Sequence, residues 1–276
     1  AFDESRTADF VAQQLRSYGI AVTTGVGKTG VVGTLKVGSS NKAIGLRADM
    51  DALPIEETND FAHKSQISGC MHACGHDGHT VMLLAAAQYL AQSQQFDGTV
   101  QFIFQPAEES NAIGSGAKAM IDDGLFERFP VDNVFGLHNT PSLLAGAMGT
   151  NSGAMLASSD PFEVTIHAKG GHGAQPHESN DPLMIAAQLL MAWQTIMSRN
   201  IKATDTAVLS ACSIHAGNTW NAIPETLVIK GTVRTFSPAV QDLIEQRFRG
   251  LTNHIAAAFG ATASIEYRRH TPCLVN

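Results

Sequence analysis

The stretch "HTVMLLAAAQYLAQSQQFDGTVQFIFQPAEE", residues 79–109, contains a helix pattern, a strand pattern and a pair of acids in succession. Its first part, residues 79–92, predicts a strongly apolar helix, and "GTVQFIFQ", residues 98–105, predicts a buried strand. Glu108 and Glu109 follow directly after that strand. A helix followed by a buried strand that ends in acids is typical of an α/β sheet with a binding site at its edge.

Similar patterns lie on both sides of this stretch. Residues 31–37 ("VVGTLKV"), 43–49 ("AIGLRAD") and 133–139 ("NVFGLHN") predict strands. Residues 5–19 ("SRTADFVAQQLRSYG") and 114–124 ("GSGAKAMIDDG") predict helices. Because strands alternate with helices, we predict an α/β domain with a mostly parallel sheet and helices on both faces.

A second, smaller α+β domain is predicted from about residue 158, where the pattern changes. Its strands and helices suggest two helices on an antiparallel sheet. The predicted strands begin at "FEVTIH" (162–167) and continue with residues 207–217, 226–236 and 262–270, and the predicted helices cover residues 181–199 and 237–260.

The composition indicates a globular protein and argues against two kinds of partner. Hydrophobic residues make up 44% and charged residues 16% of the 276, and no apolar run approaches the roughly 20 residues that span a bilayer. The net charge of -7 comes without a basic patch, so nucleic acid is not expected. The four cysteines are too scattered for a disulfide framework, and "AFDESRTADF" lacks the features of a secretion signal, so we expect a cytoplasmic protein.

Acids or imidazole follow three of the apolar strands. Asp49 and Asp51 end "AIGLRADMD", Glu108 and Glu109 follow "VQFIFQ", and His138 lies at the end of "NVFGLHN". Open α/β sheets bind ligands at the carboxyl ends of their strands. The sequence therefore predicts an active site at this edge of the sheet.

The segment "MHACGHDGHT", residues 71–80, adds residues suited to metal binding. Cys74, His76, Asp77 and His79 supply thiolate, imidazole and carboxylate groups, which suit zinc or a similar divalent transition metal. The segment alone is also compatible with a polar surface loop that contains an incidental cysteine. The acids and His138 at the ends of neighbouring predicted strands favour the metal site.

The adjacent acids Glu108 and Glu109 also allow two interpretations. Acidic pairs are common on protein surfaces, so both could be solvated loop charges. In the functional interpretation, one carboxylate binds metal while its neighbour faces the substrate as general base.

Seven segments together resemble one known family. They are "RADMDALPI", "MHACGHDGHT", "FQPAEE", "GLHN", "GGHGAQPH", "GNTWNAIP" and "GTVRTF". They occur in the order found in the M20 metallopeptidase-like amidohydrolases, in the subfamily of hippurate hydrolase and indole-acetyl-amino acid hydrolase. The resemblance implies a hydrolase of the aminoacylase type that cleaves the amide bond of small N-acyl-amino acids.

The same resemblance implies a centre with two divalent metal ions, which could be manganese, zinc, cobalt or nickel. Glu108 matches the family's general base, and Asp49 stands where the family's usual "HxDxxP" has its first histidine. The implied ligands are Cys74, His76, Glu109 and His138, with Asp51, Asp77 and His79 as supporting residues around them.

The second domain also matches residues that the family uses at its active site. His172 matches a histidine that, in family dimers, reaches into the partner's active site and stabilises the oxyanion. Asn221 and Arg234 match positions that line the same site, and Arg234 could hold a substrate carboxylate through a bidentate contact. From the sequence alone, His172 could also be an ordinary exposed histidine and Arg234 an ordinary strand arginine.

The resemblance also implies a domain organisation. Residues 1–157 would form the catalytic domain without its C-terminal part, residues 158–271 a lid and dimerisation domain, and residues 272–276 the start of a return to the catalytic domain. The return segment would carry one more histidine ligand, so the chain is expected to be partial or truncated.

The sequence also bears on three other functions. Cys74 could be the nucleophile of a cysteine-dependent amidase. The chain could be a non-catalytic metal-binding or dimerising fragment. A zinc nucleoside deaminase is disfavoured, because the "HxE" and "PCxxC" pairing of those enzymes is absent from the sequence.

Overall fold

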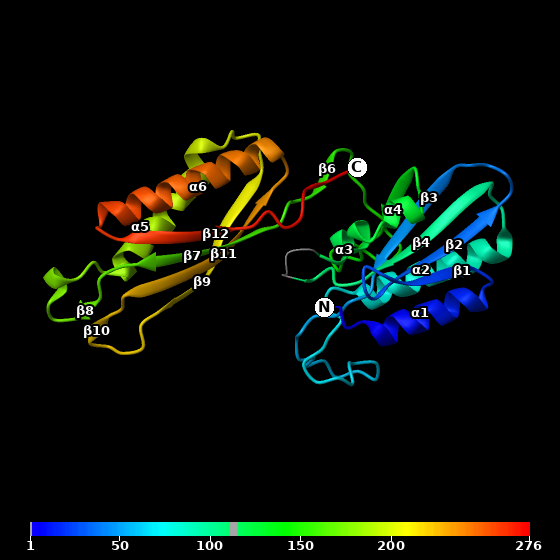
Figure 1. The fold of residues 1–276 in the computed structure, drawn as a ribbon, viewed down its shortest axis with the longest axis horizontal. Coiled ribbons are helices and arrows are strands. Elements are labelled where there is room, and N and C mark those ends of the chain that lie inside the picture. Colours follow the sequence, from blue (N-terminus) through cyan, green and yellow to red (C-terminus); the bar gives the residue numbers. More distant parts are fainter. Residues whose placement is uncertain (1, 111–114) are drawn as a thin grey trace. The chain divides into compact units, whose positions relative to one another are not determined.

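The computed structural model describes residues 2–110 and 115–276, and its contacts form two compact units, Ala1–Ala147 and Met148–Asn276 (Figure 1). The sequence placed the boundary later, at residue 157. In the structure, β6 (Ala154–Leu156) pairs with β13 (Leu274–Val275) inside the second unit. Of residues 272–276, expected to begin a return to the first domain, Leu274 and Val275 lie in this pairing.

The first unit contains a five-stranded sheet in the order β1-β2-β4-β3-β5. The strand β2 is antiparallel to both of its neighbours, whereas β3 is parallel to β4 and to β5. Four of the five strands therefore run in one direction, and the predicted mostly parallel α/β sheet is confirmed. The strands are β1 (Ala21–Val26), β2 (Gly30–Val37), β3 (Ala43–Asp49), β4 (Gly98–Gln105) and β5 (Asn133–Gly136).

Helices cover both faces of this sheet (Figure 1). Successive side chains of β4 point to opposite faces, so Phe102 and Phe104 pack with α1 and α2, whereas Ile103 packs with α3 and α4. Gly114, the first residue of one predicted helix, lies outside the described residues. The helices are α1 (Ser5–Ser17), α2 (His76–Ser93), α3 (Gly116–Asp122) and α4 (Leu125–Arg128).

Three parallel strands of this sheet end at the same edge. Asp49, the last residue of β3, is in register with Gln105, the last residue of β4. The strand β5 ends at Gly136, earlier than predicted, so His138 and Asn139 lie in the loop beyond it. This edge gathers the strand-end acids, His138 and the start of α2.

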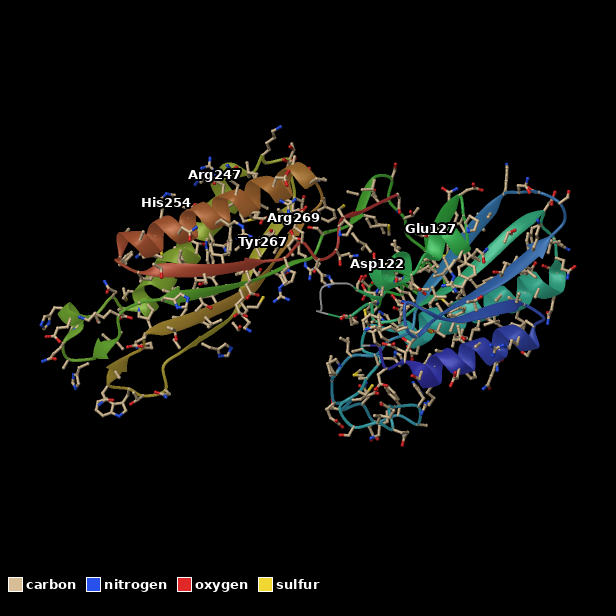
Figure 2. All side chains as sticks on the ribbon, viewed as in Figure 1. Asp122, Glu127, Arg247, His254, Tyr267 and Arg269 are labelled. Carbon is tan, nitrogen blue, oxygen red and sulfur yellow. The ribbon has the colours of Figure 1, made fainter. Side chains whose placement is uncertain are left out.

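The second unit is an antiparallel sheet in the order β12-β7-β11-β9 with two long helices packed on it. Asp181 caps α5, because its Oδ1 accepts the Leu183 N–H at 2.9 Å. Tyr267 is the last residue of β12 (Figure 2). Its hydroxyl donates to the buried Asp160 at 3.1 Å. The elements are β7 (Asp160–His167), β9 (Ala207–Ala216), β11 (Thr226–Thr235), β12 (Thr262–Tyr267), α5 (Pro182–Thr195) and α6 (Pro238–Ala258).

Within residues 2–110 and 115–276, no helix is both long enough and apolar enough to cross a membrane.

Candidate active site

The first turn of α2 carries the central residue of the site, His76. The preceding residue, Gly75, has a φ of 81° and a left-handed conformation that glycine adopts without steric cost. This turn places Cys74 just before the helix and His76 at its first position. The sequence "ACGH" thus brings two potential ligands to the same helix terminus.

His76 is buried and is fixed by a carboxylate on one side. Its Nδ1 lies 3.1 Å from Oδ1 of Asp51, and the other Asp51 oxygen accepts the Glu109 backbone N–H at 2.9 Å. The opposite ring nitrogen, Nε2, is buried and has no hydrogen-bond partner among the described residues. Buried polar atoms without partners are rare and costly. A metal ion at Nε2 would satisfy this atom, with Asp51 orienting the ring from behind.

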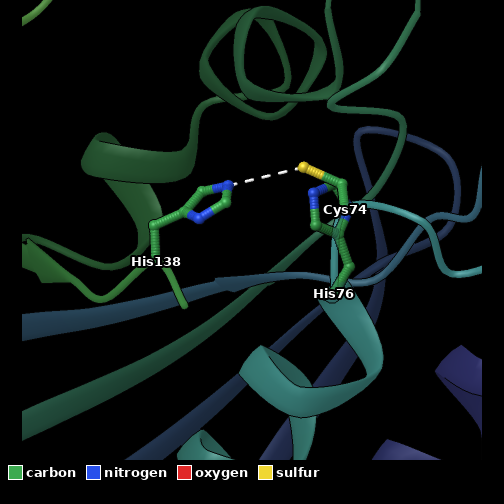
Figure 3. Close-up of side chains that lie close together, drawn as sticks. All are labelled: Cys74, His76 and His138. Atoms are coloured by element: carbon green, nitrogen blue, oxygen red, sulfur yellow. Dashed lines mark hydrogen bonds between the residues drawn. The ribbon is translucent and has the colours of Figure 1, made fainter. Parts of the chain in front are cut away.

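The remaining donor atoms surround the same space. Cys74 Sγ lies 3.4 Å from His138 Nε2, and these atoms and a His76 nitrogen lie within 4.8 Å of one another (Figure 3). A zinc–sulfur bond of about 2.3 Å and a zinc–nitrogen bond of about 2.0–2.1 Å at the tetrahedral angle would place the two ligand atoms roughly 3.5–3.6 Å apart. The separation of Cys74 and His138 therefore fits a shared ion. His76, Glu108 and Glu109 form a second group with ligand atoms within the same 4.8 Å limit.

A tight turn delivers the two glutamates. Ala107 is fully buried and has a φ of 45°, which is uncommon for a residue with a side chain. Its carbonyl accepts the Gly116 N–H at 2.9 Å, and a Cβ at Gly116 would overlap the Pro106 carbonyl. The start of α3 thus packs closely on this turn. Glu109 is held with its Oε1 3.9 Å from His76 Nε2.

Negative charge dominates this part of the unit. Burial, together with the Glu109 carboxylate, raises the pKa of Glu108. Burial also raises the pKa of the Cys74 thiol to about 12, and the nearby Glu109 carboxylate adds to this effect. These shifts reflect first the cost of burying an ionised group and then the cost of placing several anions close together. A divalent cation would relieve that cost, so the electrostatics and the donor atoms fit a metal centre.

Asp49 forms a second buried carboxylate contact at the strand edge. Its Oδ1 lies 2.6 Å from His79 Nδ1, and its Oδ2 lies 2.9 Å from Arg47 Nη1 and 3.6 Å from His76 Nε2. Although burial opposes ionisation, Arg47 and the two histidines hold the pKa of Asp49 below its usual value. Asp49 therefore stays negatively charged between the Arg47 guanidinium and the imidazoles of His76 and His79.

Asp77, which the resemblance gave a supporting role, is exposed in the first turn of α2. Its Oδ1 accepts the N–H of Gly78 at 2.8 Å. A carboxylate at this position also interacts favourably with the positive end of the helix.

In the second unit, two of the three predicted site residues lie together. β8 (Gly171–His172) pairs with β10 (Ala222–Ile223), and the Gly173 N–H donates to the Asn221 carbonyl at 2.9 Å. His172 and Asn221 are therefore neighbours on one exposed tip. The tip that carries Asn221 precedes the start of β11, whereas Arg234 lies near the end of that strand. There its Nη1 is 3.5 Å from the Ser158 carbonyl.

Two residues at the metal-binding edge, Arg47 and Asn139, received no role from the sequence, although they are the first residue of "RADMDALPI" and the last of "GLHN". Asp49 was noted only as a strand-end acid and as a departure from the family pattern. Arg47 contacts Asp49, and Asp49 and Asn139 contact His79, so these contacts join β3, α2 and the loop after β5. The presence of Arg47 and Asn139 in these segments was the only sequence feature that pointed to them. Their contacts depend on the tertiary fold.

The comparisons with known proteins agree with this geometry. Residues 45–276 match Peptidase family M20/M25/M40. The chain is 46% identical to the hippurate hydrolase of Campylobacter jejuni over 100% of this chain and 71% of that protein. It is 43% identical to the N-acetyl-L-cysteine deacetylase of Bacillus subtilis over 99% of this chain and 65% of that protein.

A solved structure extends the likeness to the fold. The YXEP protein of Bacillus subtilis, described as a dinuclear metal-binding peptidase from the M20 family, superposes with a TM-score of 0.81 at 34% identity. The match covers 100% of this chain and 71% of that chain. The chain thus spans between 65% and 71% of the lengths of these three proteins.

Proposed function

Because the chain belongs to peptidase family M20/M25/M40, we propose that it is a metal-dependent amidohydrolase that cleaves the amide bond of N-acyl-amino acids. The observation that carries this proposal is the buried Nε2 of His76, which has no hydrogen-bond partner among the described residues and lies inside a group of thiol, imidazole and carboxylate donors. The names of the two curated relatives support the substrate class, since one is a hippurate hydrolase and the other an N-acetylcysteine deacetylase.

The proposed centre holds two divalent metal ions, which could be manganese, zinc, cobalt or nickel. Its ligands in this chain are Cys74, His76, Glu109 and His138, whose donor atoms face one another at the sheet edge. When bound, the ions supply Lewis acidity that acidifies a water molecule and polarises the substrate carbonyl. Asp51 keeps His76 oriented for this role, since both of its oxygens are engaged.

Glu108 is the proposed general base. Its carboxylate takes the proton from the attacking water and passes it to the nitrogen of the leaving amine. Burial beside Glu109 raises its pKa and so makes it a stronger proton acceptor than an exposed glutamate. Its neighbour Glu109 faces His76, so the two adjacent acids divide metal binding from proton transfer.

His172 is the proposed donor to the oxyanion. Its Nδ1 accepts the Ala174 N–H at 3.1 Å, so in the neutral ring the proton lies on Nε2, which is available to donate. Asn221 lies beside it on the same tip and is proposed to contact the substrate. Arg234 is proposed to bind the substrate carboxylate through its guanidinium.

A homodimer formed through the second unit is part of the proposal, because His172 of one subunit would then serve the partner's site. We place the protein in the cytoplasm, and its four free cysteines suit a reducing compartment. The other expected partner is the small N-acyl-amino acid substrate.

We expect His172→Ala to lower kcat by about 10²-fold, because loss of one oxyanion donor typically costs 10²–10³-fold. KM should change much less, since the contact strengthens in the transition state. Steady-state kinetics on hippurate and N-acetylcysteine would measure both parameters. Exposed His177→Ala is the matched control and should behave as wild type. A loss that appears only in KM would contradict the oxyanion role.

Metal analysis tests the proposed function most directly. Elemental analysis of purified protein should find divalent metal, and dialysis against a chelator should remove the metal and the hydrolysis of N-acyl-amino acids together. Readdition of Mn²⁺, Zn²⁺ or Co²⁺ should restore activity and show which metal supports it best. Hydrolysis that survives complete metal removal would contradict the proposal.

A further inference from the structure

We infer that Asn139 is a positioning residue that holds the ligand His138 against the segment bearing Cys74 and His76. This inference rests on the proposed metal centre and assigns a role to a residue outside its ligands and base. Asn139 follows His138 in the loop beyond β5, whereas Cys74 and His76 lie at the start of α2. The two halves of the site thus come from separate segments of the chain.

Asn139 first fixes the ring of His138. Its backbone carbonyl lies 2.6 Å from His138 Nδ1. A carbonyl can only accept a hydrogen bond, so Nδ1 carries the proton and Nε2 keeps its lone pair. That Nε2 faces Cys74 Sγ at 3.4 Å. Asn139 therefore selects the tautomer in which His138 can bind an ion at the position facing Cys74.

Asn139 also contacts His79, one turn along α2 from His76. His79 Nε2 lies 3.0 Å from the Asn139 backbone nitrogen and 2.9 Å from its side-chain Oδ1. The other nitrogen of His79 is 2.6 Å from the buried carboxylate of Asp49. The loop is thus tied through His79 to both α2 and the end of β3.

The third contact reaches the turn between the two ligands of α2. Asn139 Nδ2 donates to the Gly75 carbonyl at 3.4 Å, and a Cβ at Gly75 would overlap the Asn139 side chain. Glycine at position 75 therefore permits the left-handed turn and also the close approach of the asparagine. One residue contacts His138, His79 and Gly75, so it determines the spacing between the two halves of the site.

Removing the Asn139 side chain should loosen this spacing. We expect metal-free Asn139→Ala to bind Co²⁺ about tenfold or more weakly than wild type, as for other residues that orient ligands. The thiolate-to-cobalt absorption of the bound ion should change as well, because it reports the Cys74 contact. Asn139→Asp keeps an oxygen near His79 but loses the donor to Gly75, so its affinity should be intermediate. Near-UV circular dichroism and urea unfolding would monitor the fold of each metal-free variant.

Asn180→Ala is a closely matched control in the other unit. Asn180 also donates to a backbone carbonyl, that of Phe259 at 2.7 Å, and it also lies against a glycine of positive φ, Gly260. This variant should bind Co²⁺ as wild type does.

The outcomes separate the inference from the function on which it rests. Wild-type affinity and absorption in folded Asn139→Ala would overturn the positioning role of the Asn139 side chain and leave the proposed metal centre intact. If Asn139→Ala fails to fold, Asn139→Asp decides, since wild-type binding by it would overturn the inference and weaker binding would support it. A wild-type chain that binds no Co²⁺ would overturn both the proposed function and the inference.

Discussion

Glu108→Gln is expected to lower kcat by about 10²–10⁴-fold, the range that a general base contributes, while the metal content stays at the wild-type level. Glutamine has nearly the same shape as glutamate but cannot accept a proton from water at neutral pH. Because Glu109 rather than Glu108 is the proposed ligand, the ions should remain bound. Initial rates on hippurate and elemental analysis of the same samples would measure both quantities.

Glu109→Gln is the matched comparison, since it makes the same chemical change one residue away. In the wild-type chain, Glu109 Oε1 is 3.9 Å from His76 Nε2, so removal of the Glu109 charge should lower the metal content along with the activity. The proposed division of roles requires the two variants to differ in metal content. Appreciable activity in Glu108→Gln would remove Glu108 as the base, and an equal loss of metal in both variants would make both residues ligands.

Most of the fold could be predicted from local patterns. The apolar helix at 79–92 and the strand at 98–105 are found as α2 and β4, because both are long, strongly apolar and bounded by polar residues. The end of β5 was harder to predict. "NVFGLHN" is apolar through Leu137, yet pairing with β3 ends at Gly136. Apolar sequence thus continues beyond the last hydrogen-bonded residue, and only the tertiary pairing fixes the strand's end.

The candidate ligands were predictable for a different reason. Cysteine and histidine side chains seldom cluster, so the residue types of Cys74, His76 and His138 alone indicated metal binding. The structure brings their donor atoms together. Residues that act through geometry were not predictable in this way. The positive φ of Ala107 and the three contacts of Asn139 depend on packing between distant segments. An alanine does not indicate a turn of positive φ, and an asparagine does not indicate that it positions a ligand.

Cys74 also decides between the metal centre and a cysteine nucleophile. A thiol must ionise before it can attack a carbonyl. Burial and the neighbouring carboxylates raise the pKa of Cys74 to about 12, which keeps the thiol protonated near neutral pH unless a cation is bound. His138 Nε2 lies 3.4 Å away and keeps its lone pair, but the thiolate left after it took the proton would be destabilised by burial and by the surrounding carboxylates. The surroundings therefore favour a thiolate bound to metal.

Cys74→Ser is accordingly expected to lower metal affinity by more than about 100-fold, which exceeds the loss typical of residues that only orient a ligand. Activity should fall in proportion to the bound metal. The serine hydroxyl is a poorer ligand than thiolate for a transition metal, while the change in volume is small. Co²⁺ titration and hydrolysis rates at increasing metal concentration would measure the effect, with exposed Cys212→Ser as control. Partial recovery of activity at high metal concentration supports the ligand role, because added metal cannot replace a lost nucleophile. A variant that keeps its metal and is inactive at every metal concentration would instead identify Cys74 as the nucleophile.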